Sequence, residues 1–98
     1  MARPPKSLAA LAGEPKLWRE AQAKVATLSR REMEILVGLV AGQTNPEIAA
    51  SLGISFRTVE VHRYNMREKL GERTTNGAAR VAIYAALAEI ILADAEGS

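Results

Sequence analysis

The sequence contains no cysteine and only one histidine. The lack of cysteine excludes disulfide scaffolds, cysteine nucleophiles and thiolate zinc sites, and it fits a reducing compartment. A single histidine excludes a multi-histidine metal site. We therefore expect no metal and no cofactor.

Aromatic residues make up 4% of the chain, and no alternation of apolar and polar residues persists as a strand would require. The 98 residues suffice for one small domain, which we expect to be all-α. No phosphate-binding glycine pattern and no serine–histidine–carboxylate arrangement at a motif spacing occurs, so we expect no enzyme. We also expect no membrane partner, because we find neither a signal-peptide pattern nor an apolar run approaching about 18 residues.

Helix start and stop signals are frequent along the chain. Pro15 is suited to a first helical turn, and a stripe at helical spacing follows it: Leu17, Ala21, Val25 and Leu28. Capping boxes are predicted at Ser29–Glu32 and at Thr44–Glu47. Glycines at 42, 53 and 71 are natural helix ends.

These signals predict a short linker helix from about residue 15, followed by four helices. Residues 1–26 are the predicted tail and linker, 27–94 the folded domain, and 95–98 a C-terminal tail. Ser55 is expected to cap a helix over about 56–70, and the last helix is expected to end near Ala93.

Three other residues allow simple structural interpretations. Gly38 lies inside a helix at a cost of about 1 kcal/mol relative to alanine, which suggests close approach by a neighbouring backbone. His62 is interpreted as a packed residue more readily than as a phosphate contact. Trp18 is interpreted as a packing residue of the linker helix more readily than as a binding aromatic.

The segment from Thr44 to Leu70 has the helix–turn–helix arrangement, with a short glycine-containing turn. In its second helix, Val59, Met66 and Leu70 share one side and should face the core. The opposite side is where a recognition helix reaches base edges in the major groove. The candidate base-contacting residues on that side are Arg57, Glu60, Val61 and Tyr64. The alternative interpretation is an ordinary solvated face.

Phosphate contacts are expected from helix N-termini and from cations beside the recognition helix. The candidates are Thr44, Asn45, Ser55, Thr58, Arg63, Arg67 and Lys69. For the residues at helix N-termini, capping alone is an equally simple explanation, and the two roles are compatible. The three cations could also be solvated surface charges.

The last helix is apolar on nearly all sides, with one stripe for the core: Ala78, Val81, Ala82, Ala85 and Leu92. A second stripe is left over, and a domain of this size cannot bury both. We therefore predict a homodimer interface at Ile83, Leu87, Ile90 and Ile91. A lipid-binding or aggregation-prone surface is the alternative.

The segment Leu28-Ser29-Arg30-Arg31-Glu32-Met33-Glu34-Ile35-Leu36 resembles the start of the LuxR-type DNA-binding domain, also called GerE-like, of NarL/FixJ response regulators. The resemblance continues without gaps through Gly42–Ala49, Leu52–Ser55 and Thr58–His62 to Lys69-Leu70-Gly71. It covers about residues 27–90. It implies a four-helix domain that dimerises through its last helix and reads an inverted repeat in double-stranded DNA.

By this resemblance, the usual base-contacting positions fall on Glu60, Val61 and Tyr64. The family often has a basic residue where Glu60 and Tyr64 stand, which favours weak affinity or an unusual site preference. The regulatory domain that normally precedes this module is not present in these residues.

We therefore expect a sequence-specific transcriptional regulator, or its DNA-binding domain, acting in the bacterial cytoplasm at the nucleoid. Region 4 of sigma factors has a similar helix–turn–helix, but the run from Thr58 to His62 fits the LuxR type better. The alternative function is a protein-interaction module that pairs with another regulator or with RNA polymerase and binds DNA weakly or not at all. The net charge of only +2 keeps this alternative open.

Overall fold

The computed structural model describes residues 12–97. Predictions for residues 1–11 and for residue 98 lie outside this part. Its helices are α2 (Pro15–Ala26), α3 (Arg30–Val40), α4 (Asn45–Leu52), α5 (Phe56–Leu70) and α6 (Thr75–Gly97). The all-α fold with a linker helix ahead of four helices is confirmed. Helix α6 continues beyond its predicted end near Ala93.

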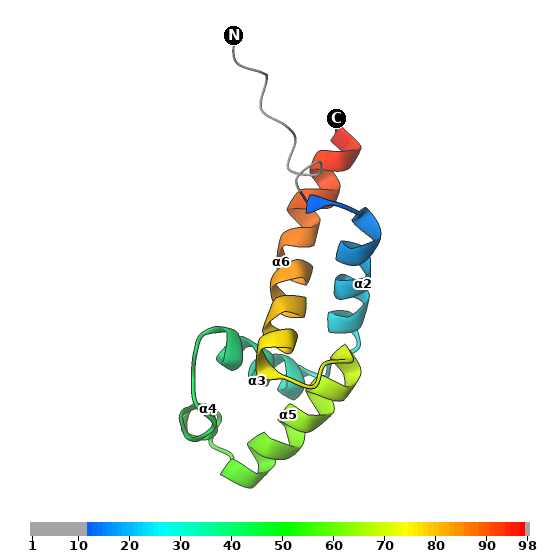
Figure 1. Cartoon of the computed structure of the whole chain (residues 1–98). Coiled ribbons are helices and arrows are strands. Elements are labelled where there is room, and N and C mark those ends of the chain that lie inside the picture. Colours follow the sequence, from blue (N-terminus) through cyan, green and yellow to red (C-terminus); the bar gives the residue numbers. More distant parts are fainter. Residues whose placement is uncertain (1–11, 98) are drawn as a thin grey trace.

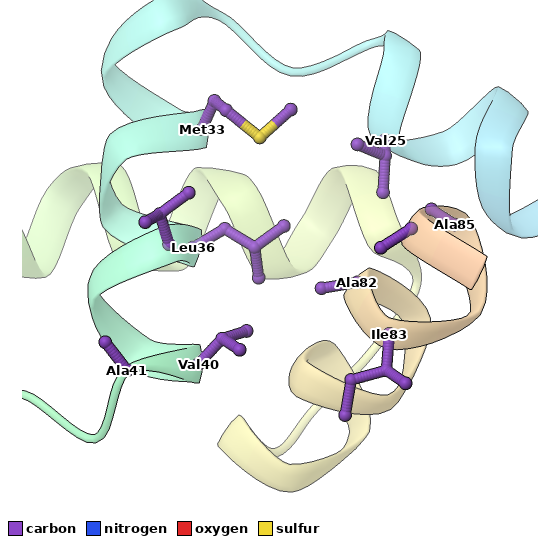
Figure 2. Close-up of a pocket in the computed structure, with 10 residues that line it drawn as sticks. Val25, Met33, Leu36, Val40, Ala41, Ala82, Ile83 and Ala85 are labelled. Atoms are coloured by element: carbon purple, nitrogen blue, oxygen red, sulfur yellow. The ribbon is translucent and has the colours of Figure 1, made fainter.

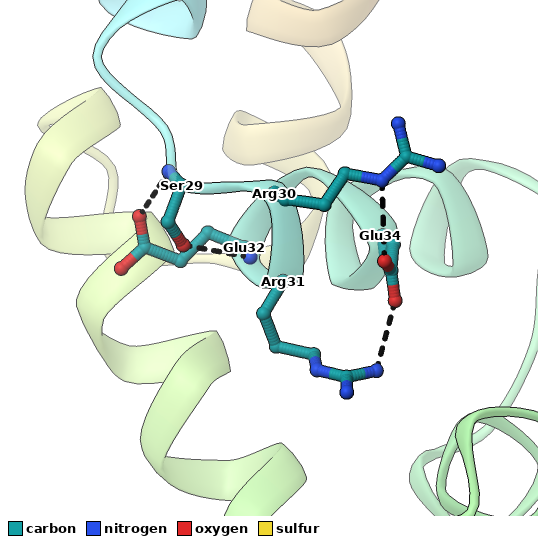
Figure 3. A network of polar contacts seen from close by, with 5 residues as sticks. All are labelled: Ser29, Arg30, Arg31, Glu32 and Glu34. Carbon is teal, nitrogen blue, oxygen red and sulfur yellow. Dashed lines mark hydrogen bonds and ion pairs between the residues drawn. The ribbon is translucent and has the colours of Figure 1, made fainter.

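Both predicted capping boxes are present. The Ser29 hydroxyl accepts the Glu32 N–H at 3.1 Å, and the Glu32 carboxylate accepts the Ser29 N–H at 2.8 Å (Figure 3). Thr44 and Glu47 make the same reciprocal pair at the start of α4. These bonds satisfy N–H groups that have no partner inside their helices, and so they fix where α3 and α4 begin.

Helices α3 and α5 pack on the first half of α6, α4 packs on α5, and α2 runs beside the remainder of α6 (Figure 1). The core lies where these elements meet. Its largest fully enclosed side chains are Ile35, Leu36, Ile48, Val59, Met66 and Leu70. The three α5 residues expected in the core are thus confirmed there.

The contact between α2 and α6 is centred on an aromatic pair. The rings of Trp18 and Tyr84 stack with centroids 4.6 Å apart, and the Trp18 indole N–H donates to the Ala12 carbonyl at 3.1 Å. Trp18 is confirmed as a packing residue. Leu17, the first residue of the predicted stripe, is exposed over 53% of its surface. Helix α2 turns the neighbouring Trp18 toward α6 instead.

The close approach at Gly38 comes from a side chain, so the predicted backbone neighbour was wrong. A Cβ at this position would lie 2.9 Å from both Cγ1 and Cδ1 of Ile48. Ile48 belongs to α4 and is fully buried. Gly38 therefore lets α4 pack directly on the α3 backbone.

Over Thr75–Asp94, α6 is long and apolar enough to cross a membrane by length and composition alone. This corrects the expectation that no stretch reaches that length. Alanine and isoleucine keep the hydropathy high although the stretch includes Arg80 and Glu89. One such helix is weak evidence for a membrane span, and in this structure α6 packs on α2, α3 and α5.

Replacing Trp18 with alanine should lower the free energy of unfolding by about 3 kcal/mol, because a large buried ring and its stacking partner are lost. Urea unfolding followed by far-UV circular dichroism measures this change. Leu17→Ala is the matched control on the next residue and should change stability by less than about 0.5 kcal/mol. Equal losses in the two variants would contradict the packing described for α2.

Candidate nucleic-acid interface

The turn between α4 and α5 is short and held by local bonds. Gly53 ends α4 in the left-handed region with φ of 66°. The Ser55 hydroxyl accepts the Thr58 N–H at 3.0 Å and lies 2.8 Å from the Thr58 hydroxyl. This confirms Ser55 as the cap of α5, and it fixes the direction in which α5 leaves the turn.

Helix α5 has one enclosed side and one open side. Val59, Met66 and Leu70 are fully buried. On the outward side the exposed fractions reach 46% for Val61 and 57% for Tyr64. All four candidate base-contacting residues are exposed: Arg57, Glu60, Val61 and Tyr64. The structure thus brings them together on one accessible face.

Phe56, the first residue of α5, is exposed over 49% of its surface. It was not among the candidate base-contacting residues predicted from the sequence. Its position next to Arg57 at the start of the outward face is the signal that could have identified it. An exposed aromatic ring there enlarges the apolar part of this face.

The outward face of α5 also carries negative charge. A hydrogen bond to Glu68, together with the charge of that carboxylate, raises the pKa of the Tyr64 hydroxyl above its ordinary value of 10.0. Glu60 and Glu68 are both exposed. Tyr64 therefore stays protonated at neutral pH and is oriented along its own helix.

The three candidate phosphate-contacting cations all donate to partners inside the domain. Arg63 donates through one terminal nitrogen to the Asn45 side-chain oxygen at 2.6 Å and through the other to the Thr75 hydroxyl. Burial, with a smaller contribution from Arg67, lowers the pKa of the Arg63 guanidinium from its ordinary value.

Arg67 donates to the Arg73 carbonyl at 3.0 Å, and its Nε is buried without a hydrogen-bond partner in the described part of the chain. Lys69 pairs with Glu32 at 2.7 Å. His62 is half-buried, as a packed residue would be.

Glu32 is a buried carboxylate that joins α3 to α5. Burial by itself raises its pKa, but the hydrogen bond from Lys69, the bonds from Ser29 and the charge of Lys69 outweigh it, so the pKa lies below the ordinary value of 4.5. Glu34, two residues further on, pairs with Arg30 and Arg31 at the surface instead (Figure 3).

An apolar groove of about 510 Å³ lies between α3 and α6, with Val25 of α2 at one end (Figure 2). Its exposed side chains include Val37, Val40 and Ile83. Ile83 also begins the candidate dimer stripe, in which Leu87 and Ile90 are exposed and Ile91 is half-buried. Ala88 lies on a different side of α6 from the stripe and is buried. Within residues 12–97 we find no cluster of three side chains that could hold a metal ion.

A model of the family described as "Bacterial regulatory proteins, luxR family" matches residues 26–82. The match spans more than half of the chain. The chain belongs to the LuxR family of bacterial regulatory proteins.

Curated relatives of this LuxR-family chain are transcriptional regulatory proteins. TdiR of Thauera aromatica is 57% identical over 51 residues, which cover 52% of this chain and 22% of TdiR. FixJ of Rhizobium meliloti is 44% identical over 62 residues, covering 63% of this chain and 30% of that protein. DctR of Rhodobacter capsulatus, a regulatory protein of C4-dicarboxylate transport, is 40% identical over 81 residues. The match covers 76% of this chain and 41% of DctR.

The crystal structure of full-length FixJ from B. japonicum superimposes with a TM-score of 0.69 at 35% identity. The match covers 79% of this chain and 38% of that one. The LuxR-family chain therefore has the fold of a LuxR-type DNA-binding domain of transcriptional regulators, a family that is not enzymatic. It spans less than half the length of these relatives.

Replacing Glu32 with glutamine should cost about 2 kcal/mol of stability at pH 7, because charge-assisted bonds to Lys69 and Ser29 are lost. The folded-state pKa of Glu32 is depressed, so its contribution is complete above 4.5 and disappears as the pH falls through the lower folded value. The stabilities of the two proteins should converge as the pH falls from 4.5 through that lower value, as measured by urea unfolding between pH 3 and 7.

Glu34→Gln is the matched control on the same helix. Its ion pairs lie at the surface, so the loss at pH 7 should be smaller. A difference between wild type and Glu32→Gln that persists unchanged at pH 3 would contradict the role given to the Glu32 carboxylate.

Proposed function

We propose that residues 27–94 form a DNA-binding domain that recognises an inverted repeat as a homodimer, with α5 in the major groove. The domain regulates transcription in the bacterial cytoplasm, at the nucleoid. The observation that carries this proposal is the two-sided α5: its inner side chains are enclosed while its outward residues are accessible. Family membership supports the same function.

The four residues of the outward face match the chemistry of base edges. Arg57 can donate two bonds to guanine O6 and N7, and Glu60 can accept from cytosine N4. Val61 offers an apolar surface for a thymine methyl group, and the protonated Tyr64 hydroxyl, which donates to Glu68, can accept from a base. Because Glu60 repels phosphates, it contributes to the preference for a particular base and not to the overall affinity for DNA.

Phosphate contacts in this proposal come from the N-termini of α4 and α5. The groups there are helical N–H donors and the polar side chains of Thr44, Asn45, Ser55 and Thr58, which favour an anion. Contacts by Arg63, Arg67 and Lys69 stay predictions. Each of these cations is already held by a partner inside the domain.

The dimer proposal rests on the stripe of Ile83, Leu87, Ile90 and Ile91 along α6. The first three are exposed over 48%, 43% and 55% of their surfaces. Such a contiguous apolar surface on a small domain marks an interaction site. An isologous contact between two α6 helices would place two α5 helices in a symmetric pair, as an inverted repeat requires.

Replacing Tyr64 with alanine should relax sequence discrimination about tenfold, the value of one good base contact. Selection of bound duplexes from a random library, followed by sequencing, measures this discrimination. Asn65→Ala, an exposed neighbour on the same helix, is the control and should recover the wild-type sequences. If Tyr64→Ala weakens binding equally on every sequence, Tyr64 does not read bases.

Replacing Leu87 and Ile90 together with lysine should give a folded monomer, because two charges would face each other across the α6 contact. Sedimentation equilibrium measures the mass, and circular dichroism checks the fold. Glu89→Lys adds positive charge at an exposed position on the same helix and should leave the dimer intact. An unchanged dimer in the Leu87→Lys, Ile90→Lys variant would rule out this interface.

A protein-interaction module that pairs with another regulator or with RNA polymerase is the second candidate function. The apolar groove between α3 and α6 favours it, because an exposed apolar surface of this kind can accept another protein. A salt titration separates the two functions. Binding through phosphates weakens steeply as ionic strength rises, whereas an apolar contact does not.

A further inference from the structure

Arg63 lies in the middle of the recognition helix and bonds to two other helices. Its guanidinium donates to Asn45, the first residue of α4, at 2.6 Å, and to Thr75, the first residue of α6. These partners are 18 and 12 residues away in the sequence. A single side chain thus ties α5 to the N-termini of both neighbouring helices.

The acceptor on α6 is free to serve Arg63 because a different residue caps that helix. The Thr74 hydroxyl accepts the Gly77 N–H at 2.9 Å. The Thr75 hydroxyl is therefore left for Arg63. Only arginine presents a rigid fork whose two terminal nitrogens can reach separate acceptors at once, since the lysine ammonium is a compact point charge.

Apolar contacts alone fix the rotation of α5 about its axis, and its position along that axis, less sharply than directional hydrogen bonds do. Val59, Met66 and Leu70 determine which side is enclosed, but hydrophobic burial is non-directional. The two bonds of Arg63 add fixed directions at the helix midpoint. A shift of about 1 Å in a reading face is enough to spoil base contacts.

We propose that Arg63 is a positioning residue, which fixes the recognition helix against the N-termini of α4 and α6 and makes no phosphate contact. This rests on the proposed function, because the geometry that Arg63 fixes is that of base reading. The bonds to Asn45 and Thr75 engage one N–H on each terminal nitrogen and hold the half-buried guanidinium between α4 and α6.

The test compares affinities for the selected inverted repeat and for an unrelated duplex at several salt concentrations. The variants are Arg63→Met, Arg63→Lys and Thr75→Val, with folding checked by circular dichroism at the temperature of the assay. Each should weaken binding to the inverted repeat about tenfold and leave the unrelated duplex within about twofold. The salt dependence should stay that of wild type, since no phosphate contact is lost.

A phosphate contact predicts a different pattern. Arg63→Met would then weaken binding to both duplexes and reduce the salt slope by about one, and Arg63→Lys would restore most of the affinity. A simple loss of stability would change neither the ratio of the two affinities nor the salt slope of the folded protein. Either result would overturn the proposal. Arg80→Met removes the same charge from an exposed position on α6 and should leave the ratio unchanged.

A double-mutant cycle in urea unfolding tests the hydrogen bond between Arg63 and Thr75 without DNA. Arg63→Met and Thr75→Val should be strongly non-additive, because either one removes the same bond. Additive effects would overturn the tie itself. If the wild-type protein prefers no DNA sequence while the cycle shows coupling, the proposed function fails but the bond between Arg63 and Thr75 is confirmed. The two failures are therefore distinguishable.

Discussion

Helix α5 can bury only one of its sides, and this constraint governs the rest of the domain. Val59, Met66 and Leu70 are enclosed by the surrounding helices, which leaves the opposite side of α5 accessible. The short turn at Gly53 and the Ser55 cap fix where α5 begins. The outward face is therefore a consequence of core packing, and its chemistry can vary without disturbing the fold.

Hydrogen bonds and an ion pair then fix more exactly the position of α5 that apolar packing determines. The Glu32–Lys69 pair joins α3 to the end of α5, and Arg63 joins its middle to α4 and α6. In each case a cation of α5 bonds to a partner within the domain. We propose that helix N-termini supply the phosphate contacts, while Arg63 connects the helix proposed to dimerise with the helix proposed to read DNA.

Local signals in the sequence predicted the helix starts and the enclosed side of α5, because caps and helical spacing involve residues only a few positions apart. The tertiary partners could not be predicted in the same way. Lys69 and Glu32 are 37 residues apart, and no periodicity points from one to the other. Likewise, whether Leu17 or Trp18 faces inward depends on where α6 lies, which helical spacing in α2 does not specify.

The central claim is that the outward face of α5 enters the major groove of two half-sites. Dimethyl sulfate footprinting on the selected duplex tests it most directly, because this reagent methylates guanine N7 in the major groove and adenine N3 in the minor groove. The account predicts protection of guanine N7 in two symmetric blocks about one helical turn apart. Protection confined to adenine N3, or no protection on a duplex that is bound, would contradict it.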